Sequence, residues 1–212
     1  LVLAPGIHDR ECSTPAAACL PLEAGTDEKM ALLAGVAAPC LAALRRTNFE
    51  IGAAGVILGL NLYGLLLVSA CRLAGAGNIS ALDADTSRRQ MAEKLGAGRV
   101  ASPEELGWPE VLVQGSSRSG ADVVFATTNQ PGLVEAIFPK CRKEARVLLL
   151  ASIPTSPLEL YNAIHSPGRI LLGPEPDRSG QQWVTDASRL LRLIQAGRYR
   201  PEGIICLLYT SD

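Results

Sequence analysis

The chain has 212 residues, of which 48% are hydrophobic, and its 20 basic and 21 acidic residues give a net charge of -1. This length and apolar content suit one large domain, or one domain with part of another, around a substantial core. The near-neutral charge and the aromatic content of 4% argue against a nucleic-acid partner, because they offer little attraction for phosphates and few rings for base stacking.

The six cysteines show no C-x-x-C pairing and fall largely inside expected core elements; they are Cys12, Cys19, Cys40, Cys71, Cys141 and Cys206. We interpret them as reduced, buried thiols of a cytoplasmic protein. The first five residues are too short for the apolar core of an export signal and lack a basic leader. Because the chain does not begin with Met, we expect a fragment of a longer protein.

The first 23 residues contain short apolar pieces between prolines, which is typical of the end of a β-rich domain. Thr26 is expected to be the N-cap of the first helix, because acidic residues follow it in the first turn. A second, separate helix is expected over residues 39–46.

The central stretch, residues 53–64, is an apolar run that breaks into glycines and then resumes as a longer apolar segment. This order predicts a strand, a tight turn and a helix that continues to residue 73. In a dinucleotide-binding unit such glycines permit a sharp turn, which brings backbone N–H groups to a pyrophosphate at the positive end of the helix. Gly59 and Gly64 occupy the first and third positions of the motif G-x-G-x-x-G.

Asn61 occupies the middle position of this motif. We expect its side chain to point into the space that a phosphate would need, and therefore to limit the affinity for a dinucleotide. On this hypothesis, the substitution Asn61→Gly tightens binding.

A membrane helix is the alternative for this part of the chain, since residues 51–71 contain no charged side chain and are long enough to span a bilayer. Four glycines and the central Asn61 argue against it. A strand, a turn and a helix explain the same length as a buried element of a parallel sheet.

A second short strand is expected over residues 78–82, and Asp83 follows it, 19 residues beyond Gly64. An acidic residue at about this distance holds the adenosine ribose hydroxyls in dinucleotide-binding units. We therefore assign this role to Asp83; the alternative is an ordinary turn residue at a strand end.

Strands and helices continue to alternate after Asp83. Residues 85–87 are expected to cap a helix that Gly96 ends. Further buried strands are expected over residues 120–126, 146–150 and 169–172, followed by a long amphipathic helix. This alternation predicts a doubly wound parallel sheet of the α/β class.

Several linked segments resemble the zinc-binding, medium-chain alcohol dehydrogenase superfamily in order and spacing. They are Leu20-Pro21, Ala43-Leu44-Arg45-Arg46, Leu82-Asp83-Ala84-Asp85 with Arg88-Arg89, Leu95-Gly96-Ala97 and Gly120-Ala121-Asp122-Val123-Val124. The resemblance implies a Rossmann-like dinucleotide-binding domain over residues 25–203, after the tail of a GroES-like catalytic domain over residues 1–24. Residues 204–212 stay unassigned. The resemblance also implies hydride transfer between an alcohol or polyol and NAD or NADP.

The resemblance also gives roles to single residues. The turn around the pyrophosphate would consist of Gly59, Asn61, Leu62, Tyr63 and Gly64, with Leu62 and Tyr63 presenting backbone N–H groups. Arg88 would lie beside the adenosine, and Thr127 and Ile153, at the ends of later strands, would flank the adenosine and nicotinamide sides. For Thr127 and Ile153, ordinary packing at a strand end is an equal alternative. A carboxylate at Asp83 favours NAD over NADP, because it would repel a 2′-phosphate.

The sequence departs from the family pattern in several places. Besides Asn61, Ala126 stands where members often have a polar residue, and residues 143–145, Lys-Glu-Ala, replace a Pro-Gly-Gly turn. Zinc is expected of the family, but we identify no ligands for it here, because residues 34–39 lack Cys, His, Asp and Glu and Cys40 is out of register. His8 and His165 are interpreted as surface or packing residues, and no catalytic residue is assigned.

Three functions are compatible with these patterns. The first is the nicotinamide-binding part of an alcohol or polyol oxidoreductase, which we expect to bind its cofactor without turning over an alcohol. The second is a non-catalytic nucleotide-binding or interaction domain. The third is a Rossmann methyltransferase, against which the family-like segments argue. The expected partner is a small alcohol or polyol, with neither nucleic acid nor a membrane, and homo-oligomer formation is left open.

Overall fold

The computed structural model describes residues 1–5, 13–114, 120–130, 132–151, 164–174, 180–200 and 204. The chain divides into two compact units, one of residues 1–42 with 175–212 and one of residues 43–174. The division falls inside helix α1 (Glu28–Arg46). The expected start of the dinucleotide-binding domain at residue 25 stays a prediction.

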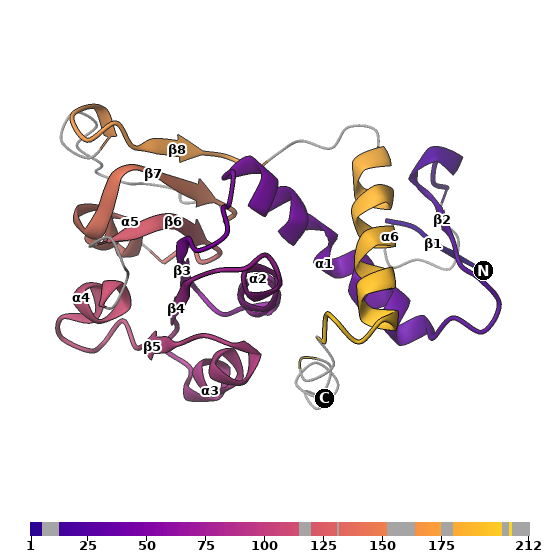
Figure 1. The fold of residues 1–212 in the computed structure, drawn as a ribbon, viewed down its shortest axis with the longest axis horizontal. Helices are drawn as coiled ribbons and strands as arrows, with labels where there is room; N and C mark the ends of the chain where they lie inside the picture. The colour runs from indigo at the N-terminus through magenta and orange to yellow at the C-terminus, as the bar shows by residue number, and fades with distance from the viewer. Residues whose placement is uncertain are drawn as a thin grey trace. The chain divides into compact units, whose positions relative to one another are not determined.

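The larger unit contains a six-stranded parallel sheet in the order β5-β4-β3-β6-β7-β8 (Figure 1). Its strands are β3 (Ala54–Leu58), β4 (Asn78–Leu82), β5 (Arg99–Ala101), β6 (Ala121–Ala126), β7 (Cys141–Leu149) and β8 (Ile170–Leu172). The chain runs outward from β3 to β5 and then returns to the other side of β3 for β6. The carboxyl ends of β3 and β6 therefore meet where the direction of winding reverses.

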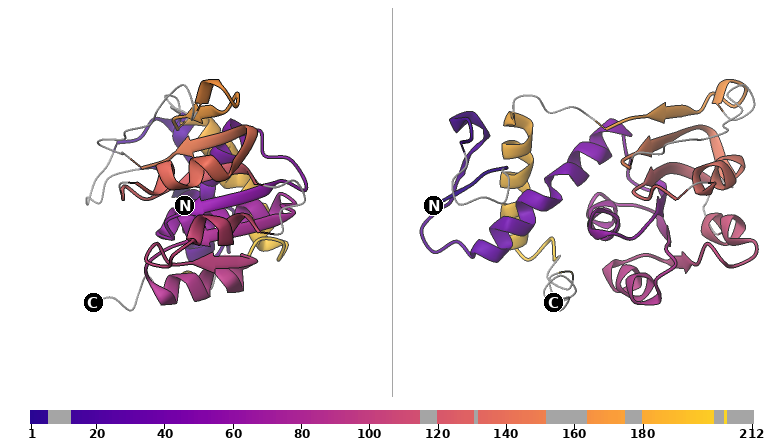
Figure 2. Two further views of the ribbon diagram at one scale, coloured as in Figure 1. Left: turned by 90° about the vertical axis from the view of Figure 1, so that its left-hand side faces the viewer. Right: turned by 180° about the vertical axis from the view of Figure 1, so that it is seen from behind.

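Helices cover both faces of this sheet. On one face lie α2 (Leu62–Leu73) and α3 (Thr86–Leu95), and on the other lie α4 (Trp108–Val113) and α5 (Leu133–Ile137), which continues into the short η2 (Phe138–Lys140) (Figure 1, and from behind in Figure 2). The predicted Rossmann-like, doubly wound sheet is confirmed.

Burial from both faces explains the long uncharged stretch. All five residues of β3 are buried, as are seven of the twelve residues of α2, so a charge in either element would lose its hydration without compensation. Among the described residues, no helix combines the length and the hydropathy that a bilayer crossing requires. The stretch weighed as a membrane helix folds instead as β3, the glycine turn and α2.

The caps of α3 follow the sequence prediction. The Asp85 side chain accepts hydrogen bonds from the backbone N–H groups of Ser87 and Arg88 at 2.7 and 3.1 Å. The bond from the Arg88 N–H, and after it the bond from the Ser87 N–H, hold the pKa of Asp85 below its usual value. At the other end Gly96 adopts a φ of 111°, a conformation that favours glycine at helix ends.

The smaller unit begins with an antiparallel pair, β1 (Val2–Leu3) and β2 (Leu20–Pro21), which agrees with the expected remnant of a β-rich, GroES-like domain. It also contains η1 (Ala16–Ala18), the first part of α1, and α6 (Gln181–Gln195).

Helix α1 corrects two predictions. Its N-cap is Asp27, not Thr26, because the Asp27 carboxylate accepts the N–H groups of Lys29 and Met30 at 2.9 and 3.1 Å. The two expected helices are one, with Pro39 inside it.

Pro39 is tolerated within α1 because of a contact with α6. Proline has no N–H to donate to the carbonyl four residues before it, which here is that of Gly35. The indole Nε1–H of Trp183, on α6, donates to this carbonyl at 3.0 Å. A hydrogen bond between distant parts of the chain thus satisfies the acceptor that Pro39 cannot.

Strand β7 contains a strained residue within residues 143–145, where the resemblance implied a Pro-Gly-Gly turn. Glu144 is exposed and has a φ of 62°, in the left-handed region that disfavours side chains with a Cβ. The β6–β7 register shifts here, between Ala121 and Val123. The backbone thus adopts a conformation that favours glycine at a residue that carries a side chain.

We predict that Glu144→Gly stabilises the chain by about 1 kcal/mol, because glycine adopts this φ without a steric cost. The measurement is the urea midpoint of unfolding. Lys143→Gly is the matched control, and it should destabilise the chain by about 0.5–1 kcal/mol through backbone entropy alone. A lower midpoint for both variants would show that Glu144 is not strained.

Candidate functional site

The turn between β3 and α2 requires glycine at both ends of the motif. Gly59 has a φ of 93°, and a Cβ on it would lie 2.8 Å from the Cβ of Thr128. A Cβ on Gly64 would lie only 2.1 Å from the carbonyl oxygen of Gly59. The first glycine therefore permits the sharp turn, and the second lets α2 pack directly on the turn's backbone.

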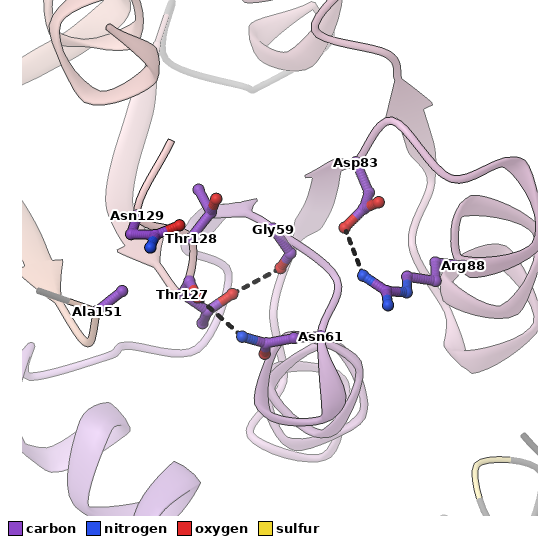
Figure 3. Close-up of a pocket in the computed structure, with 8 residues that line it drawn as sticks. All are labelled: Gly59, Asn61, Asp83, Arg88, Thr127, Thr128, Asn129 and Ala151. Carbon is purple, nitrogen blue, oxygen red and sulfur yellow. Dashed lines mark hydrogen bonds and ion pairs between the residues drawn. The ribbon is translucent and has the colours of Figure 1, made fainter. Parts of the chain in front are cut away.

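Asn61 is the N-cap of α2, with a φ of -62°. Its Oδ1 accepts the N–H of Gly64 at 3.1 Å, and its Nδ2 donates to the carbonyl of Thr127 at 2.8 Å (Figure 3). Both polar atoms of this side chain bond to the protein backbone, which argues against the expectation that they project into the space of a phosphate. A negative φ also means that the backbone needs no glycine here.

Thr127 connects the end of β6 to the same turn. Its buried hydroxyl donates to the carbonyls of Gly59 and Leu58 at 2.7 and 3.2 Å, and its N–H donates to Leu58 at 2.9 Å. Together with Asn61, Thr127 fixes the turn from the side of β6.

Asp83 holds the turn from the side of β4. Its Oδ2 accepts the N–H of Leu60 at 2.7 Å and lies 3.8 Å from Nη1 of Arg88, while its Oδ1 accepts the N–H of Asp85 at 2.9 Å. The side chain is only 12% exposed. Each carboxylate oxygen has two lone pairs, so the group can accept further bonds from a ligand's hydroxyls.

These residues surround a pocket of 380 Å³ at the carboxyl ends of β3, β4, β6 and β7 (Figure 3). Its lining is Gly59, Asn61, Asp83, Arg88, Thr127, Thr128, Asn129 and Ala151. Of the residues predicted from the sequence, Gly59, Asn61, Asp83, Arg88 and Thr127 are thus brought together, whereas Leu62, Tyr63 and Gly64 form the first turn of α2 beside the pocket. Ile153 lies outside the described residues.

Three lining residues were not singled out from the sequence. Thr128 and Asn129 extend the polar run after β6, and Ala151 follows β7. The carboxyl ends of parallel strands share one edge of the sheet. These three residues could therefore have been identified from the sequence by their position directly after predicted strands.

A zinc site is not found among the described residues, where no three His, Cys, Asp or Glu side chains lie close enough to hold a metal ion. Cys40 is buried, and this burial raises the pKa of its thiol to about 12. His165 lies in the connection before β8, where its carbonyl accepts the N–H of Gly168 at 3.2 Å. His8 lies outside the described part of the chain.

A family model described as zinc-binding dehydrogenase matches residues 63–172, about half of the chain. The chain belongs to the zinc-binding dehydrogenase family. The match covers the site from the first turn of α2 to β8, and it decides against the methyltransferase alternative.

The chain is also similar to individual dehydrogenases in sequence or in fold. The L-threonine 3-dehydrogenase of Symbiobacterium thermophilum is 32% identical over 148 residues, which are 69% of this chain and 42% of that protein. An alcohol dehydrogenase from Thermus sp. ATN1 has the same fold, with a TM-score of 0.75 at 19% identity over 88% of this chain and 53% of that one. A zinc-binding dehydrogenase of Sinorhizobium meliloti bound to NADP also has this fold. Its TM-score is 0.73 at 21% identity, over 86% of this chain and 53% of that one. The chain thus spans about half the length of the relatives it matches.

We predict that Gly64→Ala destabilises the chain by about 3 kcal/mol, because the new methyl group would collide with the backbone of Gly59 and force the turn to shift. The measurement is the free energy of unfolding in urea. Gly173→Ala is the control: a Cβ there meets nothing within 4 Å, so the change should stay within about 0.5 kcal/mol. Equal effects at both positions would contradict the proposed close packing of α2 on the turn.

Proposed function

We propose that this chain binds a nicotinamide dinucleotide in the pocket between Gly59, Asp83 and Thr127, as the cofactor-binding part of an alcohol or polyol oxidoreductase. The observation that supports this most directly is the position of Asp83. Asp83 lines the pocket and its carboxylate accepts the N–H of Leu60 at 2.7 Å, so the group proposed to bind the ribose is bonded directly to the glycine turn.

The pyrophosphate would lie at the start of α2. Backbone N–H groups at a helix N-terminus attract anions, and the helix dipole adds to this attraction. Leu62 and Tyr63 are the first two residues of α2, in agreement with the role the sequence suggested for their amides. Because Gly59 has no side chain, the pyrophosphate could approach the backbone of the turn closely.

The adenosine ribose would lie beside Asp83, whose carboxylate would accept both hydroxyls. Arg88 is 49% exposed and lines the pocket 3.8 Å from that carboxylate, which suits a position beside the adenosine. The pocket end formed by Thr127 and Ala151 would receive the part of the cofactor nearer the nicotinamide. A contact from Ile153 stays a prediction.

We predict that the chain binds NADH more tightly than NADPH, because the Asp83 carboxylate would repel a 2′-phosphate. Asp83→Asn keeps an oxygen for the Leu60 N–H but loses the charge, so it should weaken NADH binding about tenfold and reduce the preference. Titration calorimetry with both cofactors measures this. Glu93→Gln, which removes an exposed carboxylate elsewhere on α3, should change neither affinity.

Two results would contradict this proposal at different points. Failure of the unmutated chain to bind either cofactor would remove the proposed site. Equal binding of NADH and NADPH would leave the site and remove the role of Asp83.

We expect binding without turnover from these 212 residues. In zinc-dependent alcohol oxidation the alkoxide is stabilised by a metal that has three protein ligands and one open position. The described residues do not supply such a set, so the zinc expected of the family does not fit them and no reaction step is assigned to it. An NADH absorbance assay with short alcohols and polyols, with and without added zinc, measures turnover, and zinc-dependent turnover would refute the expectation.

The intact protein would act on a small alcohol or polyol in the cytoplasm. The cytoplasmic location is proposed because the sequence shows no C-x-x-C pairing and its cysteines fit buried, reduced thiols. Burial also raises the pKa of Cys141 to about 12, which keeps that thiol protonated at neutral pH.

A further inference from the structure

We propose that Asn61 is a positioning residue of the cofactor site, and that its side chain holds the glycine turn in its binding conformation. We call its two hydrogen bonds, from Gly64 N–H to Oδ1 and from Nδ2 to the Thr127 carbonyl, the Asn61 clamp. The inference rests on the proposed binding function of the pocket, and it reverses the effect expected of an asparagine at the middle position of the motif.

The Asn61 clamp joins two elements that the turn must keep in register. One bond caps α2 at 3.1 Å, and the other reaches the end of β6 at 2.8 Å. Figure 3 shows the carboxamide of Asn61 directed toward Thr127, with the Thr127 hydroxyl directed in turn toward Gly59. The start of α2, the end of β6 and the turn between them are therefore connected by side-chain bonds.

The turn needs such bonds because its own residues restrict it weakly. Gly59 has no side chain and therefore has a large backbone entropy to lose on ordering. Its carbonyl is held by Thr127 at 2.7 Å and packs against Gly64. Without the Asn61 clamp, the chain between Gly59 and Gly64 would lose its connection to β6 at residue 61.

The Asn61 clamp also explains how a turn with a side chain at its centre can still receive an anion. Two N–H groups of the motif are already bonded inside the protein, that of Leu60 to Asp83 and that of Gly64 to Asn61. The turn is thus ordered before any ligand arrives, so binding does not have to supply the free energy of ordering it. Because the carboxamide turns to the backbone, it adds no charge and keeps its polar atoms paired.

The test compares Asn61→Gly, which removes both bonds, with Asn61→Ser, which keeps a cap oxygen but is too short to reach Thr127. Two quantities are measured on the full chain: the hydrogen-exchange rate of the Gly64 amide without ligand, and the dissociation constant for NADH. Asn48→Gly is the matched control, because Asn48 is an exposed asparagine with a φ of 44° that does not line the pocket.

We expect Asn61→Gly to speed Gly64 exchange about tenfold and to weaken NADH binding about tenfold, since it removes a helix cap and a second hydrogen bond. Asn61→Ser should keep the Gly64 amide protected and still weaken NADH binding, because only the bond to β6 is lost. A loss of helix stability alone would lower the unfolding midpoint and leave the dissociation constant for NADH unchanged. The two measurements therefore distinguish a positioning role from a purely structural one. Asn48→Gly should change neither quantity.

Unchanged or tighter NADH binding by both Asn61 variants would overturn the inference while leaving the proposed cofactor site intact. If the unmutated chain does not bind NADH, the proposed function fails. The exchange rate alone then decides on the Asn61 clamp: faster exchange of Gly64 in Asn61→Gly supports the clamp, and an unchanged rate overturns it.

Discussion

The carbonyl oxygen of Gly59 is the point on which the geometry of the site depends. It accepts the Thr127 hydroxyl at 2.7 Å and lies 2.1 Å from the position that a Cβ on Gly64 would take. Strand β3, helix α2 and strand β6 therefore converge on one atom. A side chain at residue 64 would push the helix away from the turn, and loss of the Thr127 hydroxyl would leave this acceptor without its bond from β6.

Around this atom the site consists of backbone groups that side chains hold in place. Asp83 fixes the turn from β4 through the N–H of Leu60, and Asn61 fixes it from β6 through the carbonyl of Thr127. The same carboxylate that would bind a ribose thus has a structural bond of its own. The proposed binding role and the local stability would both depend on Asp83, so an isosteric substitution, and not a truncation, is needed to separate them.

The sequence predicted the elements around the site well, because local signals define them. The helix expected to end at residue 73 and the strand over residues 78–82 agree with α2 and β4, since apolar runs bounded by glycines and polar residues specify both. Gly59, Gly64 and Asp83 were identified from spacing alone. Their positions follow from the βαβ connection, which is a short-range feature of the chain.

What the sequence could not predict depends on residues far apart in the chain. Pro39 suggested a break in α1, but the Gly35 carbonyl that it leaves unpaired accepts a bond from Trp183, 148 residues away. Asn61 suggested an obstacle, but its partner Thr127 is 66 residues away. In both cases a local rule gave the correct local cost and missed a tertiary hydrogen bond that offsets it.

Asn61 also shows that the three positions of the glycine motif are constrained by different physical causes. Gly59 needs its positive φ, and Gly64 needs the absence of a Cβ. The middle residue has a φ of -62°, so only the space around its side chain restricts it. That space includes the end of β6, where a carbonyl is within reach of a carboxamide. A side chain that both caps α2 and reaches this carbonyl is therefore compatible with the turn, whereas one that can do neither would have no backbone partner at the edge of the pocket.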